Sequence, residues 1–209
     1  ISCHQPRTSY VIPAEDGTGT YDVNTTRFGP HHGPQASMLE GVLGVQIPGM
    51  EGYPARASAT HRTGASCVAC HMGESSDPSE GMHSWKPTAN ACLQCHTSGT
   101  PTVGSELTGF TSGMATLKQL LMNVEGQAVE LDAEGDPVLD ADGNLIPTGG
   151  TVTGIILDDD GSQYGIFTTI QAQAAWNYKT LLEDQSGGVH NPGYSKALLL
   201  NSIEALENE

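Results

Sequence analysis

The chain has 209 residues, of which Leu, Ile, Val and Phe together make only 40, or 19%, and its formal net charge is −16. This composition is at the edge of the range typical of disordered chains, so either the chain lacks a fixed fold or a group that is not amino acid supplies part of its core. The 24 acidic and 8 basic residues exclude nucleic acid and anionic membrane surfaces as partners, because both require a basic footprint. No apolar run of about 18 residues occurs, which excludes a membrane-spanning helix.

Residues 1–106 are rich in Gly, Pro, Ser and Thr and contain all five cysteines. Two segments, Cys67–His71 and Cys92–His96, have the form C-x-x-C-H, the attachment signature of c-type haem. We predict that the paired thiols form thioethers to the porphyrin vinyl groups and that His71 and His96 are the proximal iron ligands. The thioether cysteines of these two runs are Cys67, Cys70, Cys92 and Cys95. The alternative is a four-cysteine zinc site, which does not explain why a histidine follows each pair.

The fifth cysteine stands at the start of the chain, in Cys3-His4. These two residues match the end of a third C-x-x-C-H run whose first cysteine would precede Ile1. We therefore expect Cys3 to be a further thioether ligand and His4 a further proximal ligand, which raises the haem count from at least two to three or more. The alternative is a lone thiol beside an incidental histidine at a chain terminus.

Five histidines outside these runs are candidates for the second axial position of the irons. They are His31, His32, His61, His83 and His190. Two imidazoles fill both axial positions, so the iron transfers one electron at a time and has no open site for a substrate. This favours electron transfer over catalysis. Methionine ligation by Met72 or Met82 is the alternative, although we expect both side chains to pack on haem faces.

Residues 107–209 have a different pattern. Apolar spacing predicts helices over residues 112–124, 168–184 and 194–206. Residues 125–167 alternate instead, with acidic and glycine turns typical of a small β-hairpin insertion. One of these turns places Asp140, Asp142 and Asn144 at the spacing of a calcium loop, but Thr151 replaces the glutamate expected at the twelfth position. A plain hairpin and a calcium site both remain open.

Taken together, these patterns predict a multihaem cytochrome c fold. We expect mostly loops and short α-helices wrapped around haems, with a small β-hairpin insertion at about 125–167 and a core made mainly of porphyrin. The predicted organisation is a haem-attachment region at 1–106, with three C-x-x-C-H sites of which the first is truncated. It is followed by helices at 107–209 whose C-terminal tail supplies a distal ligand.

The order of a histidine, a C-x-x-C-H-Met run, another histidine and a second C-x-x-C-H run resembles the C-terminal haem-binding half of pentahaem cytochrome c nitrite reductase and its relatives. These relatives include octahaem reductases and small filament-forming extracellular cytochromes. The matching stretches are Phe28 to Gly33, His61 to Met72, Met82 to Trp85, Cys92 to His96 and Gly188 to Pro192. The resemblance implies a distal-ligand role for His61, His83 and His190, and for His31 or His32. The C-x-x-C-K run of the nitrite reductase catalytic haem is absent.

The sequence therefore predicts electron transfer through a row of closely spaced bis-histidine haems, and not an enzyme. Since c-type haem is attached outside the cytoplasm, we expect a periplasmic or extracellular protein. The resemblance implies a subunit of an extracellular filament, joined head to tail with other copies of itself and possible ligand donation between chains. Redox proteins or extracellular acceptors are the further partners. The alternatives are a periplasmic electron shuttle and a fragment or subunit of a multihaem reductase of nitrogen or sulfur oxyanions.

Overall fold

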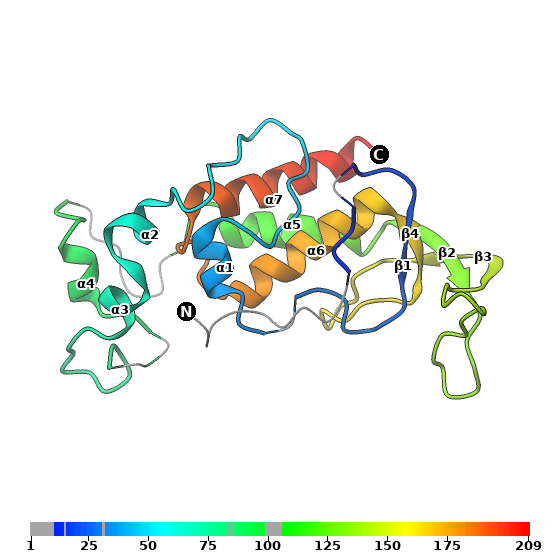
Figure 1. The fold of residues 1–209 in the computed structure, drawn as a ribbon, viewed down its shortest axis with the longest axis horizontal. Coiled ribbons are helices and arrows are strands. Elements are labelled where there is room, and N and C mark those ends of the chain that lie inside the picture. Colours follow the sequence, from blue (N-terminus) through cyan, green and yellow to red (C-terminus); the bar gives the residue numbers. More distant parts are fainter. Residues whose placement is uncertain (1–10, 15, 31, 83, 85, 99–105) are drawn as a thin grey trace.

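The computed structural model describes residues 11–14, 16–30, 32–82, 84, 86–98 and 106–209 (Figure 1). Its helices are α1 (Gln35–Glu40), α2 (Thr60–Gly64), α3 (Ser66–His71), α4 (Ala89–Leu93), α5 (Phe110–Leu121), α6 (Thr169–Asp184) and α7 (Pro192–Glu207). Its strands are β1 (Thr20–Val23), β2 (Glu125–Val129), β3 (Pro147–Thr153) and β4 (Gly165–Thr168). Figure 1 shows α2, α3 and α4 at one end, α5, α6 and α7 in the middle, and β2 and β3 at the other end.

The four strands form one antiparallel sheet in the order β1-β4-β2-β3. The β2–β3 pair has a register shift between Gln127 and Val129, which marks a bulge. Three acidic turns in residues 130–162 are each closed by a single bridge, such as Leu139 to Leu145. Strand β1 comes from the N-terminal part of the chain, so the sheet is more than a local hairpin insertion.

The prediction of a fold made mostly of loops and short helices around haems is wrong. Helices α6 and α7 have 16 residues each, pack against each other and α5, and share an apolar core with the sheet. The low content of Leu, Ile, Val and Phe did not indicate this core, because other residues fill much of it. These are Ala172, Ala174, Ala175, Trp176 and Tyr194, and each is at most 1% exposed. Small alanines allow close helix packing and aromatic rings contribute large buried areas, so few Leu or Ile residues are needed.

The predicted helices of the C-terminal half are confirmed with shifted ends. α6 begins at a capping box in which the Thr168 side chain accepts from the Gln171 backbone N–H and the Gln171 side chain accepts from that of Thr168. α7 begins after Asn191, whose side chain accepts from the Tyr194 N–H, with Pro192 in the first turn. At the N-terminus of both helices, nearby side chains therefore bond to backbone N–H groups that the helix itself leaves unpaired.

A segment without regular secondary structure, residues 43–53, is held by side chains of α6 and α7; we call it the strap. The Asn177 side chain accepts from the Val45 N–H at 2.7 Å and donates to the Val45 carbonyl at 2.9 Å, as a β-strand neighbour would. Asn201 makes the same kind of bonds to Glu51, at 3.0 Å each. Because the strap continues toward α2, these bonds fix where the segment that contains α2, α3 and α4 leaves the body of the protein.

The corner between α5, α6 and the turn at 157–161 is closed by Asp160, which has a φ of +63°. Its carboxylate lies 2.9 Å from the Lys118 Nζ and accepts from the Tyr178 hydroxyl at 2.7 Å. Burial by itself raises the pKa of Asp160, but the hydrogen bonds from Tyr178 and Lys118 and the charges of Lys118 and Lys179 lower the pKa below its ordinary value.

Candidate haem-binding site

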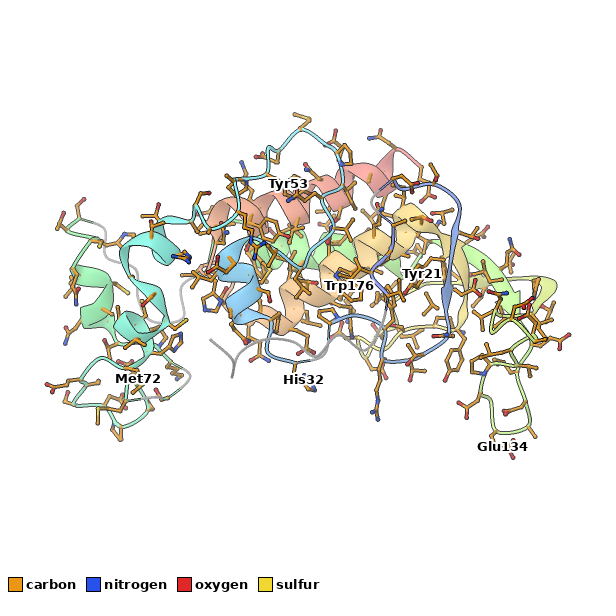
Figure 2. All side chains as sticks on the ribbon, in the orientation of Figure 1. Tyr21, His32, Tyr53, Met72, Glu134 and Trp176 are labelled. Atoms are coloured by element: carbon orange, nitrogen blue, oxygen red, sulfur yellow. The ribbon has the colours of Figure 1, made fainter. Side chains whose placement is uncertain are left out.

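Helices α2, α3 and α4 have no buried residue, in contrast to α6, which has 12. We call this end of the molecule the attachment lobe, residues 60–98. Large apolar side chains lie exposed on it and on the loop next to it: Val68 (66%), Met72 (47%), Met82 (69%), Leu93 (50%) and Val189 (38%). Figure 2 shows Met72 on the lobe and Trp176 within the central helices. These side chains supply apolar surface that a bound apolar group could cover, and comparably exposed apolar side chains, such as Met50 (88%), also lie elsewhere on the protein.

The four described cysteines lie close together in the attachment lobe, with none in a disulfide. Helix α3 places Cys67 and Cys70 one turn apart, so both thiols lie on one side of the helix. Burial and the neighbouring sulfurs of Cys92, Cys67 and Cys95 raise the pKa of the Cys70 thiol. The two C-x-x-C-H runs are therefore neighbours in space as well as in sequence.

The loop between the two runs is closed by backbone contacts. The Thr88 N–H donates to the Cys70 carbonyl at 3.3 Å, and the Met82 N–H donates to the Gly73 carbonyl at 3.2 Å. Gly81 has a φ of +61°, and a Cβ on it would lie 2.0 Å from the Gly73 oxygen, so only glycine fits this approach. These contacts hold α4 against α3.

His71 and His96 each lie near a second histidine ring, tilted by 45° and 53° respectively. The ring centroids of His71 and His190 are 6.4 Å apart, and those of His61 and His96 are 6.3 Å apart. Two imidazoles on opposite sides of one metal ion, each bonded at about 2 Å with the ring centre about 1 Å beyond the nitrogen, have centroids about 6 Å apart. The spacing of both pairs fits two axial ligands of one iron.

The partners of the distal histidines fit the same role. The Nδ1 of His190 donates to the Asp184 carboxylate at 2.7 Å, and the Nδ1 of His61 donates to the Val189 carbonyl at 2.6 Å. A metal-bound histidine characteristically donates its other ring N–H to a carboxylate or a backbone carbonyl, which fixes the tautomer and the ring orientation. In both residues the Nδ1 contact leaves Nε2 as the nitrogen that could bind a metal ion.

The loop between α6 and α7 serves both histidine pairs, because it carries Val189 and His190. Gly188 has a φ of +84°, and a Cβ there would lie 3.2 Å from side-chain atoms of Leu107 and Phe110. The Leu107 N–H also donates to the Gly187 carbonyl at 2.8 Å. The glycine pair thus turns the chain in a space too narrow for a side chain and directs the next two residues toward the attachment lobe.

His32 lies on the central body and not on the attachment lobe (Figure 2). Its Nδ1 bonds to the Glu183 carboxylate at 2.8 Å, so the last two residues of α6 each hold a histidine. Four further predicted site residues lie outside the described part of the chain: Cys3, His4, His31 and His83.

Asp184 and the Val189 carbonyl are functional groups that the sequence reasoning missed. An acidic residue at the end of a predicted helix, six positions before His190, was the only signal for Asp184. Every residue has a backbone carbonyl, so no sequence pattern could have identified the Val189 carbonyl as the partner of His61.

Among the residues that the structure describes, no group of three or more His, Cys, Asp or Glu side chains is placed to hold a metal ion. A haem iron needs only two such side chains, since the porphyrin supplies four nitrogens. At the candidate calcium turn, an oxygen of Asp140 accepts from the backbone N–H groups of Asp142 and Asn144, both at 2.9 Å, as in an ordinary acidic turn. In the described ranges no helix has the length and apolar character needed to cross a membrane.

No protein-family model, curated protein or solved structure matches this chain.

Proposed function

We propose that this chain is an electron-transfer cytochrome with two c-type haems. One haem lies between His71 and His190, and the other lies between His61 and His96. The observation that carries the proposal is the spacing of these pairs, 6.4 and 6.3 Å between ring centroids, each beside a pair of cysteines. Each haem, when bound, supplies a one-electron iron couple. The cysteines hold the group covalently, and the histidines fill both axial positions.

The closeness of the two runs supports transfer between neighbouring haems. Cys70 lies close enough to Cys92 for the two thiols to influence each other electrostatically. The exposed apolar side chains of Val68 and Leu93 supply surface for porphyrin faces. The residues of the lobe therefore bind and orient two groups side by side, and the proposal needs no substrate pocket.

The test is to produce the chain with a c-type haem maturation system and to combine intact mass with visible and paramagnetic resonance spectra. We expect a mass increment for at least two haems and low-spin spectra. The pairing is tested in the C67A/C70A background, where the haem on Cys92 and Cys95 remains. There H61A converts that haem to high spin and H190A leaves it low spin. In the reciprocal C92A/C95A background the two effects exchange. No covalent haem, or no effect of either histidine variant, would refute the proposal.

The finer form of the proposal is an extracellular filament of head-to-tail copies, with a periplasmic shuttle as the alternative. It is supported by the resemblance of the motif order and by the number of candidate distal histidines, which is five for two complete attachment runs. Negative-stain microscopy of the holoprotein over a range of concentrations tests it. Filaments are expected, and uniform small particles at every concentration would overturn the filament in favour of the shuttle. An oxyanion reductase would instead show a high-spin haem and turnover.

A further inference from the structure

The carboxylate that holds His190 is buried. Asp184 is the last residue of α6, and its side chain is 1% exposed. One of its oxygens accepts from the Nδ1 of His190 at 2.7 Å, and the other accepts from the hydroxyl of Ser186. The Ser186 hydroxyl in turn accepts from the His190 backbone N–H at 3.3 Å. Asp184 is therefore fixed by its surroundings and fixes His190.

The two distal histidines differ in the charge of their partners. His190 donates to an anionic carboxylate, whereas His61 donates to the neutral carbonyl of Val189. Both bonds involve Nδ1 and have similar lengths, so the two rings are held by hydrogen bonds of the same kind. What distinguishes the two iron sites in this respect is one buried negative charge.

A negative charge hydrogen-bonded to an iron-bound imidazole makes the imidazole a stronger electron donor and stabilises ferric iron over ferrous iron. Burial strengthens this effect, because the interaction is screened less than at a surface. His190, held by Asp184, would therefore favour loss of the electron from a haem iron that it ligates. The reduction potential of such a haem would be lower than that of a haem whose distal histidine bonds to a carbonyl.

We propose that Asp184 is a positioning residue that lowers the reduction potential of the haem held by Cys67 and Cys70 below that of the haem held by Cys92 and Cys95. Electrons would then pass preferentially from the first haem to the second. The inference rests on the proposed function, because it concerns the iron ligated by His190.

The experiment is a spectroelectrochemical titration of the holoprotein in the C92A/C95A background, which leaves the Cys67–Cys70 haem. The variant D184N keeps an oxygen that accepts from the Nδ1 of His190 but removes the charge. We expect the haem to stay low spin and its potential to rise by at least 59 mV, which is a tenfold change in the ratio of reduced to oxidised haem for one electron. D184A, which also removes the acceptor, should weaken His190 ligation and add high-spin signal.

The matched control is E183Q, which removes the neighbouring charge without touching His190. Glu183 bonds to His32, and its side chain is 21% exposed, so its field is more strongly screened. We expect a clearly smaller shift of the same haem. Equal shifts in D184N and E183Q, or none in D184N, would overturn the inference while leaving the cytochrome intact. If H190A has no effect on this haem, the proposed ligation itself has failed.

Discussion

The strongest structural prediction concerns Asn177, which joins the strap to α6. Asn177 is fully buried, and its side chain makes three hydrogen bonds: one from the Val45 N–H, one to the Val45 carbonyl and one to the Ser202 hydroxyl at 3.0 Å. Asn177→Ala leaves the Val45 N–H and the Ser202 hydroxyl without this partner, whereas the Val45 carbonyl keeps the bond from the Ile47 N–H at 3.0 Å. Because the strap is not paired with a β-strand, the Val45 N–H has no sheet hydrogen bond to replace the lost one.

The expected cost follows from the number of groups left unpaired. A buried polar group that loses its partner costs about 1 to 3 kcal/mol. Two groups at the lower half of that range, about 1 to 2 kcal/mol each, give about 2 to 4 kcal/mol, since the strap can relax partly toward water. For a chain of this size each kcal/mol lowers Tm by about 2 to 4 °C, so Tm should fall by about 10 °C.

Urea unfolding of the holoprotein, followed by far-UV circular dichroism, measures this cost. The matched control is Asn123→Ala, because within the described residues the Asn123 side chain bonds only to the Gln119 carbonyl, at the exposed end of α5. We expect the control to change the free energy of unfolding by about 0.5 kcal/mol or less. If the losses in free energy of unfolding in N177A and N123A agree within about 1 kcal/mol, the hydrogen bonds of the Asn177 side chain do not hold the strap to α6.

Three further predictions follow from single sites. Gly188→Ala should destabilise the fold by about 1 kcal/mol or more, because alanine resists a φ of +84°. It should also reduce the low-spin signal of both haems; an unchanged spectrum and Tm would contradict the role of the glycine turn. Since the pKa of Asp160 is lowered in the fold, its stabilising contribution is complete above its ordinary pKa of about 3.9 and disappears as pH falls through the lower folded value. The stability difference between wild type and D160N should therefore be present at neutral pH and vanish in acid, and a difference that persists there would exclude the Lys118 contact as its source. In haem-free chain, iodoacetamide should alkylate the exposed Cys67 before Cys70, whose thiol pKa is raised; in denatured holoprotein neither should react, and free thiols there would exclude thioether attachment.

The sequence predicted well what is encoded locally. The helices α5, α6 and α7 follow from apolar spacing and from caps such as Thr168 and Asn191, which act within one helical turn. His61 and His190 lie near His96 and His71, the histidines of the two C-x-x-C-H runs, and the distal role stays a prediction.

The parts that the sequence could not predict depend on contacts between distant segments. Tyr21 pairs with Phe167 across the sheet, and no local pattern links two strands so far apart. The strap has no periodicity, because Asn177 and Asn201 replace the strand that would otherwise bond to it. The apolar tally also missed a core filled by alanine and aromatic rings, as around Trp176.

The loop that carries His190 has a consequence for the order in which the protein is made. His61 reaches the Val189 carbonyl 128 positions later in the chain. Covalent haem attachment needs only the five residues of one run, whereas the second axial ligand needs the loop before α7. In the proposed cytochrome, an exported chain would thus carry covalent haem before its second axial ligand is in place. A low-spin spectrum would then report that the C-terminal helices have docked, and a chain truncated before α7 would keep its haems in the high-spin state.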